Sequence, residues 1–390
     1  MDKKKVAVLL PWLKMGGTNK VALRFIKQLM EYCDVTLVLS QNTGELLEEV
    51  PEGVHIVVDE MREFKDIFKE DILKFQISNL IKDLMYYARI KLKKDNIDNY
   101  RYLVERHSPI SSEKFDCAIS YHGQSPERLL NLLYRTYAGK KVAWIHGEMS
   151  FSADTCQRMA KYYAKLDRFF FVSRPTMDSF QRKIGVDAAK CTIYYNPLDK
   201  AEIIHLANLP MDIEFDNSWT NLLTVGRISA EKGQDMIPKI TRKLVDMGYK
   251  IRWYIVGDGD MRSKIEKLIQ ENRVEDNVII LGVKTNPYCY MKACDIYVQP
   301  SYTEGYSTTI CEAGILGKAI IGTKPSGGIR EQITDGKDGL IVDATVAGLT
   351  EGILEVLKNE ELLHRFEQQI QRKNFDGKGE INKFLAYINK

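Results

Sequence analysis

Residues 296–323 read IYVQPSYTEGYSTTICEAGILGKAIIGT, and this stretch contains the local pattern that decides the fold. Its first six residues, IYVQPS, form a short β-branched and aromatic run that is typical of a buried strand. TTICEAGILG then has the composition of a helix, and Thr308 or Thr309 is the expected N-cap. The closing KAIIGT is a second strand. A strand, a helix and a strand in this order predict a βαβ unit of a parallel sheet.

The same alternation extends over most of the chain and falls into two series. The expected strands are 5–11, 34–40, 54–59, 115–121, 140–146 and 168–173 in the first series, and 221–227, 250–259, 277–282, 296–301, 318–323 and 339–343 in the second. A chain of 390 residues suits about two domains of ordinary size. We therefore expect an α/β fold with two doubly wound, Rossmann-like domains, 1–200 and 218–375. The polar, proline-containing segment 198–220 is the candidate linker.

The composition excludes several classes of protein. Hydrophobic residues make up 44% and charged residues 28% of the chain, which indicates a globular protein. The net charge of +3 argues against a nucleic-acid binder driven by bulk charge. The seven cysteines are scattered and contain no CxxC pair. This pattern argues against a disulfide framework or a zinc site and favours a reducing compartment.

The N-terminus begins with an apolar run that is too short for a signal peptide and is interrupted by Pro11 and Lys14. It is more typical of a first buried strand. No apolar segment approaches the ~20 residues that span a bilayer. We expect a soluble protein, or one that is at most peripheral to a membrane.

Ligands of doubly wound sheets bind beyond the carboxyl ends of the strands, so the polar residues that follow each strand are the candidates for a site. Glu304 lies in such a turn, and Glu312 lies near the first turn of the next helix. The helix N-terminus between them favours an anion, and Gly305 permits a close approach of the backbone. This layout suits a sugar joined through phosphate to a ribose. The alternative is that Glu304 is a solvated turn residue and Glu312 only complements the helix dipole.

Cations follow another strand of the second series. Arg227 and Lys232 come shortly after the strand that ends near Gly226. Arginine offers a planar fork to phosphate oxygens and lysine a point charge, so the pair suits a diphosphate. The alternative is two surface cations near the start of a helix.

Glycines and a histidine mark three further strand ends. Gly257 follows one strand of the second series, where a GxG pattern is most often a tight turn. Gly16 and Gly17 follow the first strand without forming the dinucleotide fingerprint, which argues against a dehydrogenase. His146 follows a strand of the first series, and we favour a functional role for it over a packed structural histidine.

Four motifs in order resemble glycosyltransferase family 4: the GG at 16–17, GR…EKG within 226–233, VGDG at 256–259 and E-x7-E at 304–312. The resemblance implies a GT-B fold, with two Rossmann-like domains facing each other across a cleft. A C-terminal helix, roughly 376–390, would pack back on the N-terminal domain. It also implies a retaining hexosyltransferase that needs no metal and no cofactor besides its nucleoside-diphosphate sugar.

The resemblance assigns roles to these residues. Arg227 and Lys232 would hold the donor diphosphate, Glu312 the ribose, and Glu304 the transferred sugar, while His146 would lie near the anomeric carbon. The implied catalytic residues are His146, Glu304, Arg227 and Lys232. The implied donor-binding residues are Gly16, Gly17, Gly226, Gly257, Glu304, Gly305, Tyr306, Ser307, Thr308, Thr309 and Glu312.

The chain also departs from the family pattern. Many members have EGFGLP where this chain has EGYSTT at 304–309, so that Ser307 replaces a glycine and Thr309 a proline. NPLD at 196–199 stands where NGVD is common. These departures concern the donor sugar rather than the class of reaction.

The helical insert 61–107 interrupts the first series. It carries basic and aromatic residues, namely Arg89, Lys91, Lys93, Lys94, Arg101, Tyr86, Tyr87 and Tyr100. Such a segment can lie on an anionic membrane surface, or it can be an ordinary solvated helical face. With the family resemblance, it suggests a saccharide acceptor, lipid-linked, at the cytoplasmic face of a membrane in cell-surface polysaccharide synthesis.

Two alternatives to a transferase stay open at this point. One is another enzyme of the same fold, such as a nucleotide-sugar epimerase or a phosphorylase. The other is a non-catalytic partner that binds sugar nucleotides. Loss of Arg227, Lys232 or either glutamate would favour the second alternative, and all four residues are present.

Overall fold

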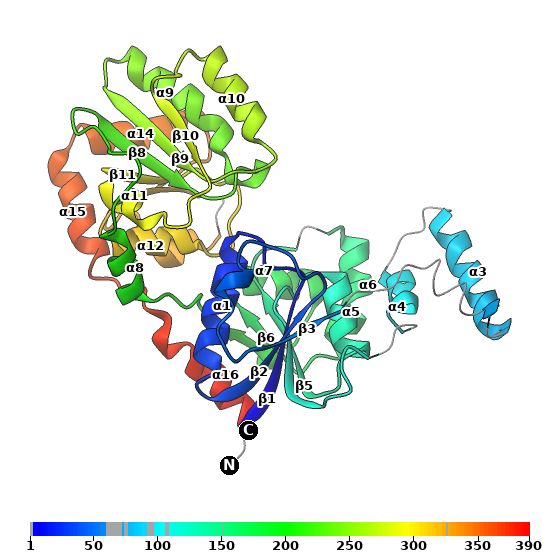
Figure 1. The fold of residues 1–390 in the computed structure, drawn as a ribbon. Helices are drawn as coiled ribbons and strands as arrows, with labels where there is room; N and C mark the ends of the chain where they lie inside the picture. Colours follow the sequence, from blue (N-terminus) through cyan, green and yellow to red (C-terminus); the bar gives the residue numbers. More distant parts are fainter. Residues whose placement is uncertain are drawn as a thin grey trace. The chain divides into compact units, whose positions relative to one another are not determined.

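A computed structural model of the chain describes residues 3–59, 72–73, 77–91, 97–105, 109–149, 151–324 and 327–390. The chain forms two compact units. The first contains Met1–Tyr195 together with Glu380–Lys390, and the second contains Asn196–Gly379. Each unit has one parallel sheet with helices packed against it (Figure 1). The predicted α/β class is therefore confirmed.

The first sheet has seven strands in the order β3-β2-β1-β4-β5-β6-β7, and every pair is parallel. The strands are β1 (Lys4–Leu10), β2 (Cys33–Leu39), β3 (His55–Val58), β4 (Phe115–Ser120), β5 (Ala138–Ile145), β6 (Arg168–Phe171) and β7 (Cys191–Ile193). The sequence analysis does not predict β7, because three half-buried residues at the sheet edge carry too little pattern.

Helices pack on both faces of this sheet. The unit contains α1 (Gly17–Leu29), α3 (Ile77–Lys91), α4 (Ile97–Glu105), α5 (Pro126–Tyr134), α6 (Ala153–Tyr163), α7 (Arg174–Ile184) and α16 (Ile381–Ile388), of which α3 packs against α4. Neighbouring residues of β5 point to opposite faces, as strand geometry requires. Ala143 packs in one core cluster with side chains of α5, α6 and α7. Trp144 instead contacts Phe25 of α1 and Phe384 of α16.

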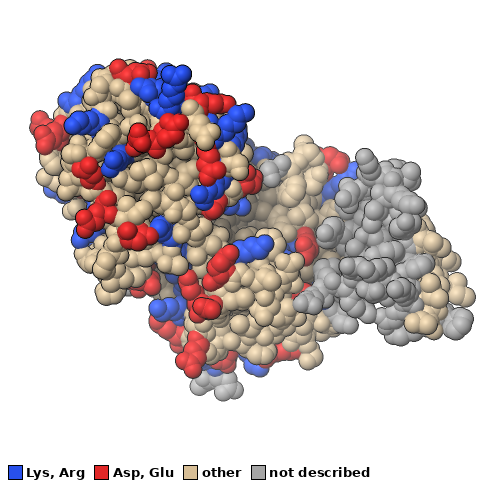
Figure 2. Space-filling model, turned by 45° about the horizontal axis from the view of Figure 1, so that its top comes forward, with Lys and Arg blue, Asp and Glu red and all other residues tan. Residues whose placement is uncertain are grey.

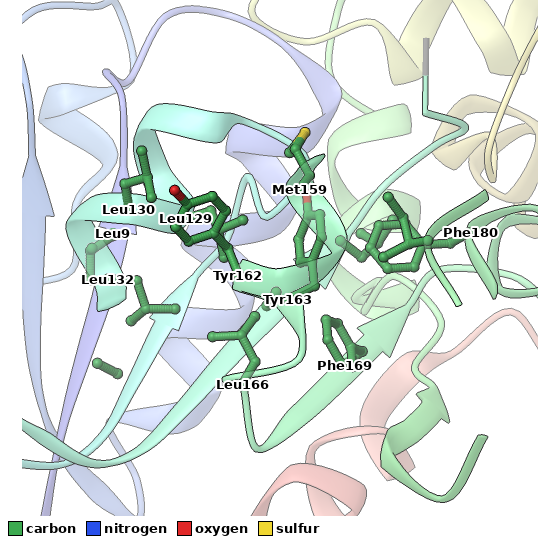
Figure 3. Close-up of a cluster of buried hydrophobic side chains, with 14 of the residues drawn as sticks. Leu9, Leu129, Leu130, Leu132, Met159, Tyr162, Tyr163, Leu166, Phe169 and Phe180 are labelled. Atoms are coloured by element: carbon green, nitrogen blue, oxygen red, sulfur yellow. The ribbon is translucent and has the colours of Figure 1, made fainter. Parts of the chain in front are cut away.

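The core cluster on the α5–α7 side fills the space between strands and helices with large apolar side chains. Figure 3 shows Leu129 of α5, Met159 of α6, Phe180 of α7 and Phe169 of β6 gathered there. Burying such side chains contributes roughly 1.5–3 kcal/mol each, so this layer accounts for much of the stability of the unit.

The second sheet has six strands in the order β10-β9-β8-β11-β12-β13, and it is also parallel. Its strands are β8 (Thr220–Val225), β9 (Ile251–Val256), β10 (Val278–Gly282), β11 (Ile296–Gln299), β12 (Ala319–Thr323) and β13 (Leu340–Val342). Its helices are α8 (Lys200–Ala207), α9 (Ile237–Asp246), α10 (Arg262–Glu271), α11 (Tyr288–Ala293), α12 (Thr308–Ile315), α13 (Ile329–Gln332), α14 (Val346–Leu357) and α15 (Glu360–Ile370).

The segment 198–220 is not a linker, contrary to the expectation from its polar composition. It contains α8, and Leu198, Ile203 and Phe215 belong to a buried cluster of the second unit. The chain passes between units at Tyr195 and Asn196, and again at Gly379 and Glu380. The C-terminal helix therefore lies in the first unit, where Phe384 contacts Phe25 at a ring-centroid distance of 5.5 Å.

The strand order reverses once in each sheet. In the first sheet the reversal lies between β1 and β4, and in the second between β8 and β11. Loops that follow such neighbouring strands diverge to opposite faces of the sheet and leave a crevice at its carboxyl edge. In the second unit, the loop after β8 carries Arg227 and Lys232, and the loop after β11 carries Glu304.

Figure 2 presents one face of the molecule, with Lys and Arg in blue and Asp and Glu in red. On the face that Figure 2 presents, basic and acidic side chains alternate without a broad patch of one sign. This agrees with the net charge of +3. Within the described part of the chain, no helix is both long enough and apolar enough to cross a membrane.

Candidate functional site

Three loops at the carboxyl edge of the second sheet pack against one another through their backbones. They are 226–233 after β8, 257–261 after β9 and 300–307 after β11. The Ile228 N–H donates to the Asp258 carbonyl at 2.9 Å, and the Tyr302 N–H donates to the Glu231 carbonyl at 2.8 Å. These bonds hold the three loops as one surface.

Two glycines make this close packing possible. Gly257 has a φ of +146°, and a Cβ there would lie 2.0 Å from the Gly226 carbonyl oxygen. Gly233 has a φ of +66°, and its Cβ would lie 2.2 Å from the carbonyl oxygen of Pro300. A larger residue at either position would both strain the backbone and separate the loops. Apart from its two neighbours in the chain, no atom of the part that the structure describes lies within 4 Å of a Cβ built on Gly226, so that position faces open space.

Lys232 and Glu304 form an ion pair between the loops that follow β8 and β11. The Lys232 Nζ lies 2.5 Å from Oε2 of Glu304, and the side chains are only 22% and 15% exposed. The Ser301 hydroxyl donates to the same carboxylate oxygen at 3.5 Å. An ammonium has three N–H donors, so Lys232 can bind Glu304 and an anionic ligand at the same time.

Arg227 lies beside this pair but has a different partner. Its guanidinium donates to Oε1 of Glu231 at 2.8 Å, and its side chain is 68% exposed. The same Glu231 oxygen accepts from the Ser229 hydroxyl at 2.7 Å. Arg227 is therefore a surface cation tethered near the site, whereas Lys232 is held within it.

The first turn of α12 presents backbone donors at the same edge. The N-cap is Ser307, not Thr308 or Thr309 as expected, and its hydroxyl accepts from the Ile310 N–H at 3.4 Å. Thr309 is the second residue of the helix, and its hydroxyl donates to Oε1 of Gln299 at 3.1 Å. Within the part of the chain that the structure describes, the N–H groups of Thr308 and Thr309 donate to no protein acceptor.

Glu312 is the fifth residue of α12 and is 6% exposed. The Tyr288 hydroxyl of α11 donates to its Oε1 at 3.1 Å. Tyr306 packs against the neighbouring apolar cluster, and Gly305 approaches Gly328 closely. The predicted residues of the second unit therefore surround one strand-order reversal. They include two carboxylates, two cations and the N-terminus of a helix.

The remaining predicted residues lie in the first unit. Gly16 is the N-cap of α1, and Gly17 is its first residue. His146 follows β5, and its backbone N–H donates to Oε1 of Gln124 at 3.1 Å. The His146 ring lies 4.8 Å from the ring of Tyr121. These positions agree with strand ends at the carboxyl edge of the first sheet.

A second histidine lies near His146 that the sequence analysis does not single out. The His122 ring, after β4, is 6.2 Å from the His146 ring, and its Nε2 lies 3.4 Å from Oδ1 of Asn19. Its sequence signal is the same as that of His146, a histidine at the end of an apolar strand. Asn19, Gln124 and His122 are thus additional polar residues at this edge.

Both imidazoles are neutral at physiological pH. Burial, together with the neighbouring His122, lowers the pKa of His146 to about 3. Burial and the charge of Arg128 lower the pKa of His122 to about 4. His146 therefore has a buried ring nitrogen, Nε2, without a hydrogen-bond partner among the described residues, and its neutral ring does not supply a positive charge.

Among the described residues, no three His, Cys, Asp or Glu side chains are arranged to hold a metal ion. The positive potential of the second-unit site comes from Arg227, Lys232 and the α12 N-terminus. These groups suit phosphate oxygens, and the carboxylates of Glu304 and Glu312 suit hydroxyl donors.

Comparison with known proteins agrees with this chemistry. Residues 213–373 match the model of the family described as glycosyl transferases group 1. The chain is similar to the N-acetylgalactosamine-N,N'-diacetylbacillosaminyl-diphospho-undecaprenol 4-alpha-N-acetylgalactosaminyltransferase of Campylobacter jejuni. The two are 26% identical over 208 residues, which are 53% of this chain and 55% of that protein. It is also similar to the 2-deoxystreptamine N-acetyl-D-glucosaminyltransferase of Niallia circulans, with 25% identity over 190 residues, 47% of this chain and 48% of the other. The chain thus spans about half the length of these curated relatives.

Among solved structures, the chain is similar to HepE of Anabaena in complex with UDP and glucose. The TM-score is 0.72 at 16% identity, and the match covers 99% of both chains. At this identity the likeness concerns the fold. The chain has the GT-B fold, and the resemblance to glycosyltransferases that the motifs indicate is confirmed.

Proposed function

From a chain whose residues 213–373 match the model of the glycosyl transferases group 1 family, we propose a retaining hexosyltransferase. It moves a sugar from a nucleoside-diphosphate sugar to a hydroxyl of a saccharide acceptor. The observation that carries the proposal is the meeting of Lys232, Glu304 and the α12 N-terminus at the β8–β11 reversal. Cationic and N–H donors for a diphosphate lie there beside carboxylates for sugar hydroxyls.

In this proposal, the second unit binds the donor. Lys232 and the N–H groups of Thr308 and Thr309 hold the diphosphate, and Arg227 contributes from the surface. Glu312 accepts hydrogen bonds from the ribose, and Glu304 from the transferred sugar. Gly226 and Gly257, together with Gly16 and Gly17 of the first unit, let the backbone approach the donor.

The chemical step separates the sugar from the diphosphate. Negative charge builds on the leaving phosphate oxygens as the glycosidic bond breaks, and preorganised donors stabilise it without reorganisation. Retention follows when the acceptor hydroxyl attacks from the face that the diphosphate leaves and gives its proton to the departing phosphate oxygen. The neutral His146 would orient hydroxyls near the anomeric carbon.

The first experiment identifies the donor. A panel of nucleotide sugars is screened by thermal shift, because a ligand at 100 times its Kd adds about 2.7 kcal/mol of stability. The donor that binds is then incubated with saccharide acceptors, and the anomeric configuration of the product is read by NMR. A product that keeps the donor configuration supports the proposal. Sugar phosphate formed with inorganic phosphate would instead identify a phosphorylase, and an altered nucleotide sugar an epimerase.

We further propose that the acceptor is lipid-linked and that the insert 61–107 contacts the inner face of the cell membrane. Ile77, Ile81, Leu84 and Met85 of α3 are exposed and recur at helical spacing, so they share one face. The name of the Campylobacter jejuni relative specifies an undecaprenol-linked acceptor for that protein. Lys93 and Lys94, two cations of the predicted basic stretch, lie outside the described residues, and only the backbone of Arg89 and Lys91 is described.

Vesicle co-sedimentation tests the membrane contact. The double substitution Ile81→Glu and Leu84→Glu should abolish binding to vesicles that contain anionic phospholipid. Leu209→Glu, at an exposed apolar position of the second unit, is the control and should bind as the parent chain does. Equal binding of the double variant would contradict the contact through α3.

A further inference from the structure

Gln332, the last residue of α13, has a side chain with 0% exposure that binds the backbone of Ser307. Its Nε2 donates to the Ser307 carbonyl oxygen at 2.5 Å, and its Oε1 accepts from the Ser307 N–H at 3.2 Å. The backbone carbonyl can only accept and the N–H can only donate, so the two bonds fix the orientation of the amide. The peptide groups on both sides of the Ser307 Cα are thereby held.

The position of Gln332 is itself anchored. The Lys373 ammonium donates to the Gln332 carbonyl oxygen at 2.8 Å and forms an ion pair at 2.8 Å with the buried Asp338. The Gln332 Nε2 also lies 2.9 Å from the sulfur of Cys311. Burial raises the pKa of the Cys311 thiol to about 12, so the sulfur is a neutral neighbour.

The two loops that meet here cannot move independently. A Cβ built on Gly328 would lie 2.1 Å from the Gly305 carbonyl oxygen, which means that the backbones touch. Gly305 belongs to the loop after β11, and Gly328 directly precedes α13. A shift of α13 would therefore displace the loop that leads into α12.

Ser307 is the N-cap of α12, so its peptide geometry sets the direction of the next two N–H groups. Those of Thr308 and Thr309 donate to no acceptor within the described residues. Where the family pattern has a proline, whose ring fixes φ, this chain has Thr309. The side-chain amides of Gln299 and Gln332 restrain the same turn by hydrogen bonds instead.

We propose that Gln332 is a positioning residue for the diphosphate of the donor, a role that rests on the proposed function. It touches no substrate and acts through Ser307, by aiming the Thr308 and Thr309 N–H groups at the phosphate oxygens. Substitution of Gln332 should weaken the binding of ligands that carry phosphate. It should not change the binding of the nucleoside, because that portion is assigned to Glu312.

The test is calorimetric titration of the full chain with UDP, GDP, ADP, CDP and dTDP. The affinity for each corresponding nucleoside is measured by competition against its diphosphate. Gln332→Met keeps the size of the side chain and removes both hydrogen bonds. Gln332→Glu keeps the acceptor for the Ser307 N–H and loses the donor. It is titrated in place of the first variant if that variant does not fold. Asn221→Leu is the control, because Asn221 is 1% exposed and its amide donates to two backbone carbonyls at the amino end of β8.

We expect Gln332→Met to lower the affinity for the diphosphate that the parent chain binds, by about tenfold or more. The affinity for the nucleoside should change less than twofold. The control should lower the melting temperature without changing diphosphate affinity. Unchanged diphosphate affinity in Gln332→Met, or an equal loss for diphosphate and nucleoside, would overturn the positioning role. A parent chain that binds none of the five diphosphates would overturn the proposed function itself.

Discussion

The Lys232 ammonium lies 2.5 Å from the Glu304 carboxylate, although the two residues are 72 positions apart in the sequence. Their loops follow β8 and β11, the two neighbouring strands between which the strand order reverses. The ion pair therefore joins the proposed diphosphate contact to the proposed sugar contact. A ligand that binds here meets a lysine whose position is already fixed.

Lys232→Ala should lower kcat by about 100- to 1,000-fold, since removing one preorganised donor from a transition state typically has this effect. The fold should persist, because the side chain is at the edge of the core. Lys264→Ala is the control, since Lys264 is an exposed lysine of α10 whose ammonium lies 3.9 Å from Asp235. The turnover of both variants is measured by steady-state kinetics with the identified donor. Near-normal turnover of Lys232→Ala would show that Lys232 does not take part in catalysis.

Gly233→Ala should abolish most activity, because its Cβ would lie 2.2 Å from the Pro300 carbonyl oxygen and force the two loops apart. Gly248→Ala is a matched control. Gly248 also has a positive φ, +87°, but apart from its two neighbours in the chain no atom of the described residues lies within 4 Å of its Cβ. Both variants carry the backbone strain of roughly 1–2 kcal/mol, which a thermal melt measures. Similar activity losses in both variants would show that strain alone, and not loop contact, is responsible.

Turnover should survive excess EDTA. Lys232, Arg227 and the N–H groups of α12 offer N–H donors at the proposed phosphate position, so we expect the diphosphate to bind without a metal ion. The rate is measured with the identified donor before and after chelation. A complete loss of rate that magnesium restores would contradict this expectation.

The stability of the first unit should fall as the pH is lowered from about 6.5 toward 3. Burial lowers the pKa of His146 from 6.5 to about 3, so in this range the unfolded state binds a proton that the native state does not. Unfolding is therefore favoured as the pH falls, and this contribution is absent above the unfolded pKa. His146→Asn should reduce the drop in the urea midpoint between pH 7.5 and pH 5. His205→Asn, at an exposed position, is the control and should keep the drop of the parent chain.

Local sequence patterns predict those parts of the molecule that depend on neighbouring residues. The strands around β8, β11 and β12 follow from short apolar runs bounded by glycine and polar residues. The placement of Lys232 and Glu304 at strand ends follows from the same pattern. The fold class can therefore be predicted without coordinates.

Features that depend on tertiary contacts are not predictable in this way. Threonine is favoured at N-caps, but Thr309 lies inside the helix, and Ser307, whose backbone is extended at φ −80° and ψ 113°, caps it. The segment around α8 is polar overall, yet the side chains of Ile203 and Phe215 are buried in the core of the second unit. Gln332 has no local signal, because its partner Ser307 lies 25 residues away.

In the proposed function, one donor molecule is held at both ends by Glu304 and Glu312, with its diphosphate at α12. Glu312→Gln should weaken the binding of both the nucleotide sugar and the free nucleoside diphosphate, because both ligands carry the ribose. Glu304→Gln should weaken only the nucleotide sugar, because the free diphosphate lacks the transferred sugar.

Calorimetric titration of each variant with both ligands is the most direct measurement. A hydrogen bond to a charged group contributes about 1.5–3 kcal/mol, which predicts a loss of roughly 10- to 150-fold in each affected case. We expect the affinity for nucleoside diphosphate to fall in Glu312→Gln and to stay near that of the parent chain in Glu304→Gln. Equal loss of diphosphate affinity in the two variants, or unchanged affinity for both ligands in both variants, would show that the two glutamates do not hold opposite ends of the donor.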